Sequence, residues 1–173
     1  MPTNIEIKCR VHNPDALRAK VERLSDGPVE RLEQTDTFFR SHVGRLKLRQ
    51  EAPREGVLIQ YQRPSETGPK ASHYQMARTD DPEILRNILS TELGVLGTVR
   101  KSRQLYRVGR TRIHLDEVEG LGDFLELEVV LGPEDAVIDG HAEAENLMNR
   151  LGIHPDDLIE CAYLDLLLEL ERS

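Results

Sequence analysis

The chain has 173 residues, of which 38% are hydrophobic and 31% charged, and these values fit one soluble globular domain. The net charge of −8 makes the surface as a whole repel nucleic acid, so any phosphate-binding site must concentrate its cations locally. Aromatic residues make up only 4% and Trp is absent, which argues against a platform for stacking single-stranded bases. We therefore expect a single domain over residues 1–173 and no nucleic-acid partner.

The predicted elements begin with a strand over residues 3–11. A helix then starts at Asn13 and Pro14, with Asn at the N-cap and Pro in the first turn, and it ends before residues 26–28. Three strands follow, over residues 31–40, from residue 45 to a turn at 53–56, and over residues 57–63.

The second half of the chain begins with a strand over residues 72–77. A helix then starts at residues 81–82 and ends at Gly94, with Ile84, Leu85, Ile88 and Leu89 on its buried side. Three more strands are predicted, over residues 98–108, 110–118 and 123–131. Two helices follow, over residues 136–151 and 158–170. Eight strands with four helices indicate the α+β class.

The cysteines and the apolar segments of the chain indicate the cellular compartment of the protein. Cys9 and Cys161 lie far apart and form no metal-ligand pattern, which fits a reduced protein. No cationic segment followed by an apolar one opens the sequence, and the longest apolar stretch, residues 162–170, is interrupted by Asp165 and Glu169. We expect a cytoplasmic protein with no membrane partner.

Period-2 alternation of charged and apolar residues is the strongest pattern in the sequence. It occurs in residues 4–8, 44–49, 112–116 and 125–129. Eight antiparallel strands can close into a barrel with a small lumen. If the charged faces point inward, the apolar faces need cover, which the helices can supply. We therefore expect an antiparallel eight-stranded β-barrel or tunnel with a charged lumen.

A solvated face is the ordinary explanation for charged alternation in an antiparallel sheet. Here the charges separate by strand, because Arg45, Lys47 and Arg49 are all cationic whereas Glu126 and Glu128 are both anionic. Like charges in a row are unfavourable unless a ligand or a neighbouring strand compensates them. Arginine suits bidentate phosphate binding, and carboxylates suit Mg²⁺ or Mn²⁺. The pattern therefore indicates a site for a phosphate chain and a divalent metal.

Taken in order, the segments resemble the CYTH superfamily, the triphosphate tunnel metalloenzymes, and within it the class IV adenylyl cyclase branch. The matching segments are residues 5–8, 44–49, 100–106, 112–122 and 124–128. The resemblance covers nearly the whole chain as one CYTH-like domain. It implies an eight-stranded tunnel that binds a triphosphate inside, together with Mg²⁺ or Mn²⁺.

The resemblance also implies roles for individual residues. Phosphates would be held by Arg45, Lys47, Arg49, Arg63, Lys101, Arg103 and Arg112. Metals would be bound by Glu6, Glu126 and Glu128. Lys8 inside the tunnel and Asp116 near metal or substrate are the implied catalytic residues. The strand parity of Arg63 leaves open whether its side chain faces the tunnel.

One position departs from the family pattern. The signature Glu-x-Glu-x-Lys reads Asn4-Ile5-Glu6-Ile7-Lys8 here, so an amide replaces the first carboxylate. The lost charge lowers the expected metal affinity or removes one metal site. His114 shares a strand face with Arg112 and Asp116, and we interpret it as a structural or purine-edge residue in preference to a metal ligand.

The leading functional expectation is conversion of ATP to cyclic AMP and pyrophosphate. The alternatives are hydrolysis of an inorganic or organic triphosphate, and non-catalytic binding of a nucleotide or polyphosphate, which Asn4 favours. The partner in each case is a small triphosphate molecule. The apolar C-terminal helix could support a homodimer, although core packing explains Leu164, Leu167 and Leu168 equally well.

Overall fold

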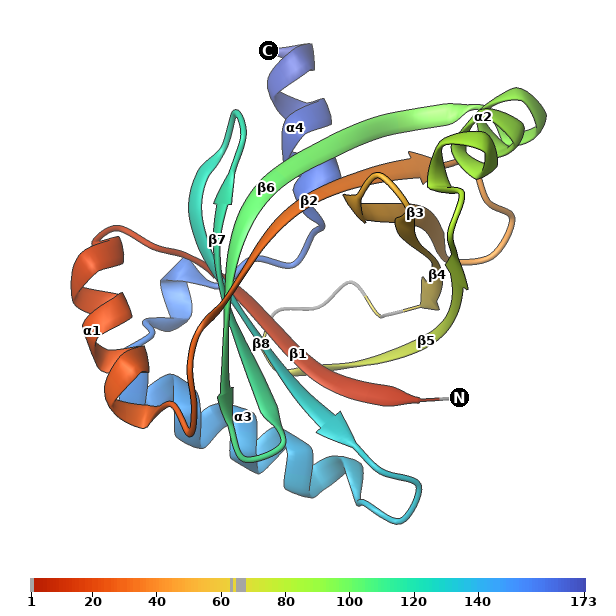
Figure 1. Cartoon of the computed structure of the whole chain (residues 1–173). Helices are drawn as coiled ribbons and strands as arrows, with labels where there is room; N and C mark the ends of the chain where they lie inside the picture. Colours follow the sequence, from red (N-terminus) through yellow and green to blue (C-terminus); the bar gives the residue numbers. More distant parts are fainter. Residues whose placement is uncertain (1, 63, 65–67) are drawn as a thin grey trace.

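A closed barrel of antiparallel strands organises the molecule (Figure 1). The computed structural model describes residues 2–62, 64 and 68–173, so Arg63 lies outside the described residues. The strands are β1 (Thr3–Arg10), β2 (Glu30–Phe39), β3 (Arg45–Ala52), β4 (Glu55–Gln62), β5 (Lys70–Thr79), β6 (Val95–Val108), β7 (Thr111–Val118) and β8 (Gly122–Leu131). Their order around the barrel is β1-β5-β4-β3-β2-β6-β7-β8, and β8 pairs with β1 to close it. The predicted α+β barrel is therefore confirmed.

The period-2 alternation of β1 sets the two faces of the barrel wall. Asn4, Glu6 and Lys8 line the cavity inside the barrel, whereas Ile5 and Ile7 face outward and are fully buried. On β3, β7 and β8 charged groups likewise face the lumen, whereas β4 contributes Ile59 and Tyr61 to it, so the lumen has both charged and apolar parts. The charged part is the arrangement that the charged alternation predicted.

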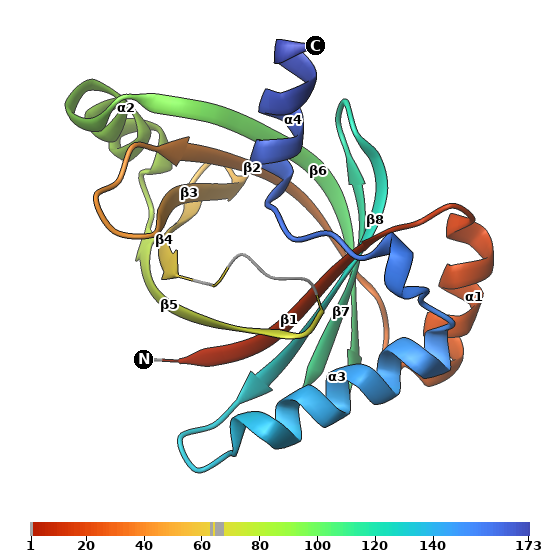
Figure 2. The ribbon, with the colours of Figure 1, turned by 180° about the vertical axis from the view of Figure 1, so that it is seen from behind.

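Helices cover much of the outer wall. They are α1 (Pro14–Leu24), α2 (Pro82–Leu93), α3 (Val137–Leu151) and α4 (Tyr163–Arg172), and a short 3₁₀ turn spans Pro155–Asp157. Figures 1 and 2 both show α1 and α3 on one side of the barrel. Val21 of α1 and Leu147 and Leu151 of α3 pack there against outward-facing Ile7 and Leu127. None of the helices in the described part of the chain has the length and apolar character needed to cross a bilayer.

Two expectations about the helices are wrong. Ile84 and Ile88 of α2 are 56% and 53% exposed, whereas Leu85 and Leu89 are half-buried, on a helix that contacts β2, β3 and β4. The last helix begins at Tyr163, five residues later than predicted. The preceding residues stay extended because Leu158 forms a bridge with Cys9, and the Ile159 N–H donates to the Lys8 carbonyl at 2.9 Å.

Candidate functional site

The barrel encloses a cavity of about 230 Å³ to which all eight strands contribute side chains. Lumen-facing charges fall into two sets, one of cations around a carboxylate on β2, and one of carboxylates on β8. Ala162 and Tyr163, at the start of α4, also line this cavity. The site therefore draws on strands that are far apart in the sequence.

Asp36 is the centre of the cationic set, which we call the cation cluster and define as Lys47, Arg49 and Lys101. Arg49 donates to both Asp36 oxygens at 2.8 Å, and the Lys47 Nζ lies 2.9 Å from Oδ2. The Lys101 Nζ lies 3.6 Å from the same oxygen. Burial opposes ionisation of Asp36, but Arg49 and the two lysines hold the pKa of this carboxyl well below its usual range. Asp36 is therefore a buried anion in the middle of the predicted phosphate-binding residues.

Lys101 has an unusual proton affinity. Burial, followed by repulsion from Arg103, lowers the pKa of Lys101 to about 7, although the Asp36 carboxylate acts in the opposite direction. Its ammonium group also lies 5.3 Å from the centre of the Tyr163 ring. Lys101 is thus a lumen cation whose charge changes near neutral pH.

The carboxylates of β8 form the second set. Glu126 lies 3.3 Å from the Lys8 Nζ and 3.1 Å from an Arg103 nitrogen, and Glu128 lies 2.9 Å from Arg112. Burial opposes ionisation of both, but Lys8 and Arg103 hold the Glu126 pKa well below its usual range, and His114 and Arg112 lower the Glu128 pKa. Both side chains are therefore anionic at neutral pH and available to bind a cation.

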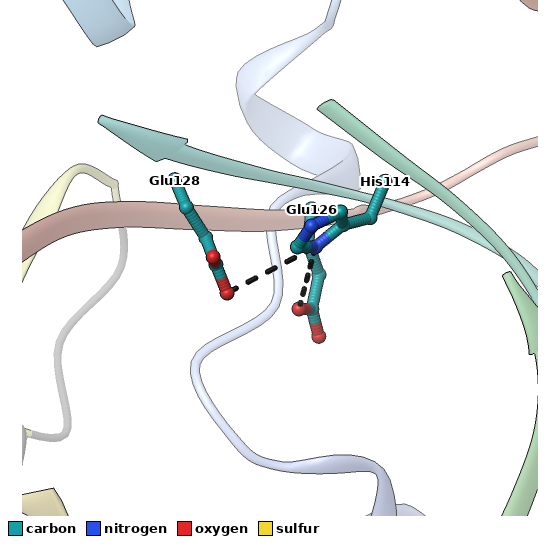
Figure 3. Close-up of side chains that lie close together, drawn as sticks. All are labelled: His114, Glu126 and Glu128. Carbon is teal, nitrogen blue, oxygen red and sulfur yellow. Dashed lines mark ion pairs between the residues drawn. The ribbon is translucent and has the colours of Figure 1, made fainter. Parts of the chain in front are cut away.

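His114 lies beside these carboxylates (Figure 3). Its Nδ1 is 3.9 Å from one oxygen of Glu126 and 3.9 Å from one oxygen of Glu128. One potential ligand atom from each of the three residues lies within 4.8 Å of the others. Burial and then Arg103 lower the His114 pKa, which favours the neutral imidazole that a metal requires. The donor set fits a divalent metal, because two carboxylates and one imidazole converge on a shared space.

Asp116 supports the site from the inward face of β7, which it shares with Arg112 and His114. Arg103 donates to both Asp116 oxygens at 2.7 Å, and the Tyr163 hydroxyl donates to one of them at 2.8 Å. The residues that line the cavity include Arg103 and Tyr163 but not Asp116. Asp116 is therefore placed to orient Arg103, and its oxygens are already used.

Tyr163 contributes the face of its ring to the lumen. The Lys8 Nζ lies 4.0 Å from the ring centre and donates to the Cys161 carbonyl at 3.2 Å. Lys70 donates to the Glu160 carbonyl at 2.6 Å. Lysines of β1 and β5 thus fix the segment that leads into α4 against the barrel.

The structure brings most of the predicted site residues into one cavity. Those that line it are Glu6, Lys8, Lys47, Arg49, Lys101, Arg103, Arg112, Glu126 and Glu128. Glu6 is the register partner of Glu128, but within the described residues it is not part of the three-residue group around His114. Arg45 lies in a separate hollow, where it pairs with Asp165 at 2.6 Å. Arg63 falls outside the described residues.

Sequence reasoning missed Asp36 and Tyr163. Asp36 shares the inward face of β2 with Gln34 and Phe38, so alternation alone could have placed it in the lumen. Its pairing with the cation cluster follows from the β2–β3 register and, for Lys101, from the β2–β6 register, which no local pattern specifies. Tyr163 was within a segment interpreted as outer cover, and nothing local indicates that its ring reaches the lumen.

Comparison with known proteins agrees with this geometry. Adenylate cyclase CyaB from Aeromonas hydrophila is 26% identical over 168 residues, covering 92% of this chain and 85% of that protein. The PH1012 protein from Pyrococcus horikoshii OT3 has the same fold, with a TM-score of 0.82, 24% identity, and coverage of 94% of this chain and 98% of that chain.

A putative adenylyl cyclase from Hippeastrum, described as having a dominant triphosphatase activity, also shares the fold. Its TM-score is 0.65 at 22% identity, over 96% of this chain and 95% of that chain. The model of the CYTH domain matches residues 2–163. With that match over nearly its whole length, the chain belongs to the CYTH domain family.

Proposed function

We propose that this protein is a metal-dependent enzyme that converts ATP to cyclic AMP and pyrophosphate inside the barrel. One observation carries the proposal: the cation cluster and the carboxylates of β8 line the same cavity. A phosphate chain needs the cations, and the metal that accompanies it needs the carboxylates. The name of the Aeromonas hydrophila relative supports the same reaction.

The cation cluster would hold the phosphate chain, together with Arg103 and Arg112. Arg103 is oriented in advance by its two hydrogen bonds to Asp116, so little freedom is lost when it binds a phosphate oxygen. Asp36 competes with the substrate for Lys47 and Arg49. A triphosphate carries more charge than one carboxylate, and it therefore wins that competition.

The reaction forms a bond between the ribose 3′-oxygen and the α-phosphorus. The bond from that phosphorus to the oxygen of the β-phosphate breaks, and its electron pair leaves with pyrophosphate. The hydroxyl proton passes to solvent, and the lumen cations stabilise the charge on the leaving group. Glu126 and Glu128 would hold a divalent metal, which would supply Lewis-acid activation of the hydroxyl.

Apolar side chains in the same cavity favour a nucleotide over an inorganic triphosphate. They include Leu32, Phe38, Ile59, Tyr61, Met76, Val99 and Leu105. Inorganic triphosphate has no apolar part that would use such a wall, whereas a nucleoside has an aromatic base.

The second candidate is hydrolysis of a triphosphate. It is favoured by the triphosphatase activity described for the Hippeastrum neighbour. The same cations and carboxylates would serve, with water in place of the ribose hydroxyl as the nucleophile. The product is then orthophosphate.

The deciding experiment incubates the purified protein with ATP or inorganic triphosphate, in Mg²⁺ or Mn²⁺, and resolves all products by chromatography. We expect cyclic AMP and pyrophosphate from ATP. Glu126→Gln should lower the rate by roughly 10²-fold or more, because it removes a metal-binding charge. Glu117→Gln is the matched control, because Glu117 lies exposed on the outer face of β7.

Orthophosphate without cyclic AMP would replace the cyclase with the triphosphatase. Intact substrate despite measurable binding would overturn both enzyme proposals and leave a nucleotide or polyphosphate sensor.

A further inference from the structure

His114 is a buried imidazole with an unused nitrogen. The side chain lies on β7, directly across from Glu126 in register, and the residue is only 4% exposed. Its Nδ1 is buried and has no hydrogen-bond partner among the described residues. A buried polar atom without a partner costs free energy, so a histidine that served only the fold would be expected to use this nitrogen.

The carboxylates nearby do not satisfy that nitrogen. Nδ1 is 3.9 Å from Glu126 Oε2 and 3.9 Å from Glu128 Oε1, and both distances are too long for hydrogen bonds. Figure 3 shows both carboxylates on one side of the ring, with dashed lines from His114 to one oxygen of each. The three groups therefore surround a common space without bonding to one another.

The other end of each carboxylate is held by a cation. Glu128 presents Oε1 to the imidazole while its Oε2 pairs with Arg112 at 2.9 Å. Glu126 presents Oε2 to the imidazole and pairs through Oε1 with Lys8 at 3.3 Å. Arg103 also reaches Glu126 Oε2 at 3.1 Å, so this oxygen would be shared between a metal and the guanidinium. These pairs fix the direction in which the carboxylates face His114.

Asn4 is a second lumen residue that bears on how a metal would be bound. Its side chain lines the same cavity and is buried, and its Oδ1 has no hydrogen-bond partner in the described part of the chain. An amide oxygen is a weaker metal ligand than a carboxylate, so the lumen lacks one negative charge at this position. A metal in this barrel therefore gains from an additional donor elsewhere.

We propose that His114 is a metal ligand together with Glu126 and Glu128, and that its nitrogen makes the site select Mn²⁺ and Zn²⁺ over Mg²⁺. The proposal deepens the proposed function and rests on its metal-bearing lumen. Mg²⁺ strongly prefers oxygen ligands, whereas imidazole suits first-row transition metals and Zn²⁺. The neutral tautomer with its proton on Nε2 leaves the Nδ1 lone pair free to coordinate.

The direct test is pulsed electron paramagnetic resonance of Mn²⁺ bound to the full chain, without nucleotide. We expect electron-spin-echo modulation from a directly coordinated ¹⁴N nucleus. Protein labelled with ¹⁵N only at histidine should replace it with ¹⁵N modulation. Absence of any histidine-nitrogen coupling in the bound complex overturns the proposal, and this result does not depend on any variant folding.

Variants identify which histidine is responsible. His114→Gln should abolish the nitrogen modulation, whereas His42→Gln should keep it, because His42 is exposed in the turn between β2 and β3 and does not line the cavity. Modulation that survives in His114→Gln would overturn the assignment to His114.

Calorimetric titrations with Mn²⁺, Zn²⁺ and Mg²⁺ test the selectivity. In His114→Gln we expect roughly tenfold or greater weakening for Mn²⁺ and Zn²⁺, with a much smaller change for Mg²⁺. Equal losses for all three metals would overturn the selectivity. Because no nucleotide is present, these metal-binding results do not depend on turnover. Nitrogen coupling in a protein that makes no product would contradict only the proposed function. Product formation without nitrogen coupling would contradict only the assignment of His114 as a ligand.

Discussion

Arg49 and Asp36 are direct partners in the β2–β3 register, and the guanidinium binds both oxygens of the carboxylate. Lys47 and Lys101 converge on the same carboxylate. A barrel that gathers cations for a substrate has to keep them stable before the substrate arrives. Asp36 meets that need by acting as an internal counterion.

Asp36→Asn should destabilise the ligand-free protein. The substitution removes the anion that Lys47, Arg49 and Lys101 share, and losing one partner of a buried ion pair costs about 3–5 kcal/mol. Added tripolyphosphate should restore more stability to Asp36→Asn than it adds to the wild type, because the ligand replaces the missing charge. Urea unfolding with and without tripolyphosphate measures both effects, and Glu33→Gln on the exposed face of β2 is the control. Equal stabilisation of the two proteins by the ligand would contradict the counterion role.

Binding of a triphosphate near pH 8 should be accompanied by proton uptake at Lys101. Its pKa of about 7 means that this amine is mostly neutral at pH 8 in the free protein, and a bound polyanion favours the charged form. Calorimetry in buffers of different ionisation enthalpy measures the uptake. Lys101→Arg should take up fewer protons, because arginine stays charged throughout. Identical uptake in the two proteins would remove Lys101 as the source.

The same shift predicts how stability depends on pH. The folded-state pKa of Lys101 lies below the value of about 10.4 for an unperturbed lysine, so the unfolded chain binds more protons between these two values. This residue therefore makes stability rise with pH across that window. In Lys101→Met the contribution disappears, and chemical unfolding at pH 7 and pH 9 should show a smaller pH-dependent gain than in the wild type. An unchanged gain would mean that other groups determine the slope.

Asp116 should act through Arg103. In Asp116→Asn the buried guanidinium loses its bidentate partner, and we expect a loss of about 3 kcal/mol in the free energy of unfolding. Tyr163→Phe removes one neutral hydrogen bond to the same carboxylate and should cost about 1 kcal/mol. Urea unfolding ranks the two variants. A larger effect for Tyr163→Phe would show that the contact with α4, and not Arg103, is the main partner of Asp116.

Restoring the family carboxylate at position 4 should strengthen Mg²⁺ binding. Asn4→Glu adds a hard oxygen ligand and a negative charge to the lumen, and we expect roughly tenfold tighter Mg²⁺ binding by calorimetry. Asn4→Gln is the control, because it has the same length without the charge. The preference for Mn²⁺ over Mg²⁺ should fall in Asn4→Glu, since the imidazole then matters less. Unchanged Mg²⁺ affinity would show that position 4 is too far from the metal to contribute.

The fold was largely predictable because two local signals agreed. Alternation of charged and apolar residues in β1, β3, β7 and β8 required an inside and an outside, and capping residues such as Asn13 marked where helices begin. The prediction that Ile84 and Ile88 are buried was wrong, because an apolar stripe on a helix is buried only where another element covers it. The start of α4 was missed because the Leu158–Cys9 bridge is a tertiary contact that overrides helix propensity.

The site was predictable in composition but not in pairing. Alternation identified Lys47, Glu126 and other lumen residues, yet it could not show that Arg45 turns away to Asp165. Nor could it show which carboxylates face cations and which face His114, because this depends on the register between strands. Local patterns specify which face a residue occupies, whereas its neighbour on that face is fixed only when the barrel closes.

The closure of the barrel through β1 has a consequence for biosynthesis. β1 pairs with β5 and β8, and its Cys9 and Lys8 also contact the segment before α4. During translation this strand leaves the ribosome well before any of these partners, with its apolar face and both hydrogen-bonding edges uncovered. Long-range pairing of this kind is slow and exposes intermediates to aggregation. The barrel is therefore expected to close only after β8 has been synthesised, and until then β1 lacks the partner that completes it.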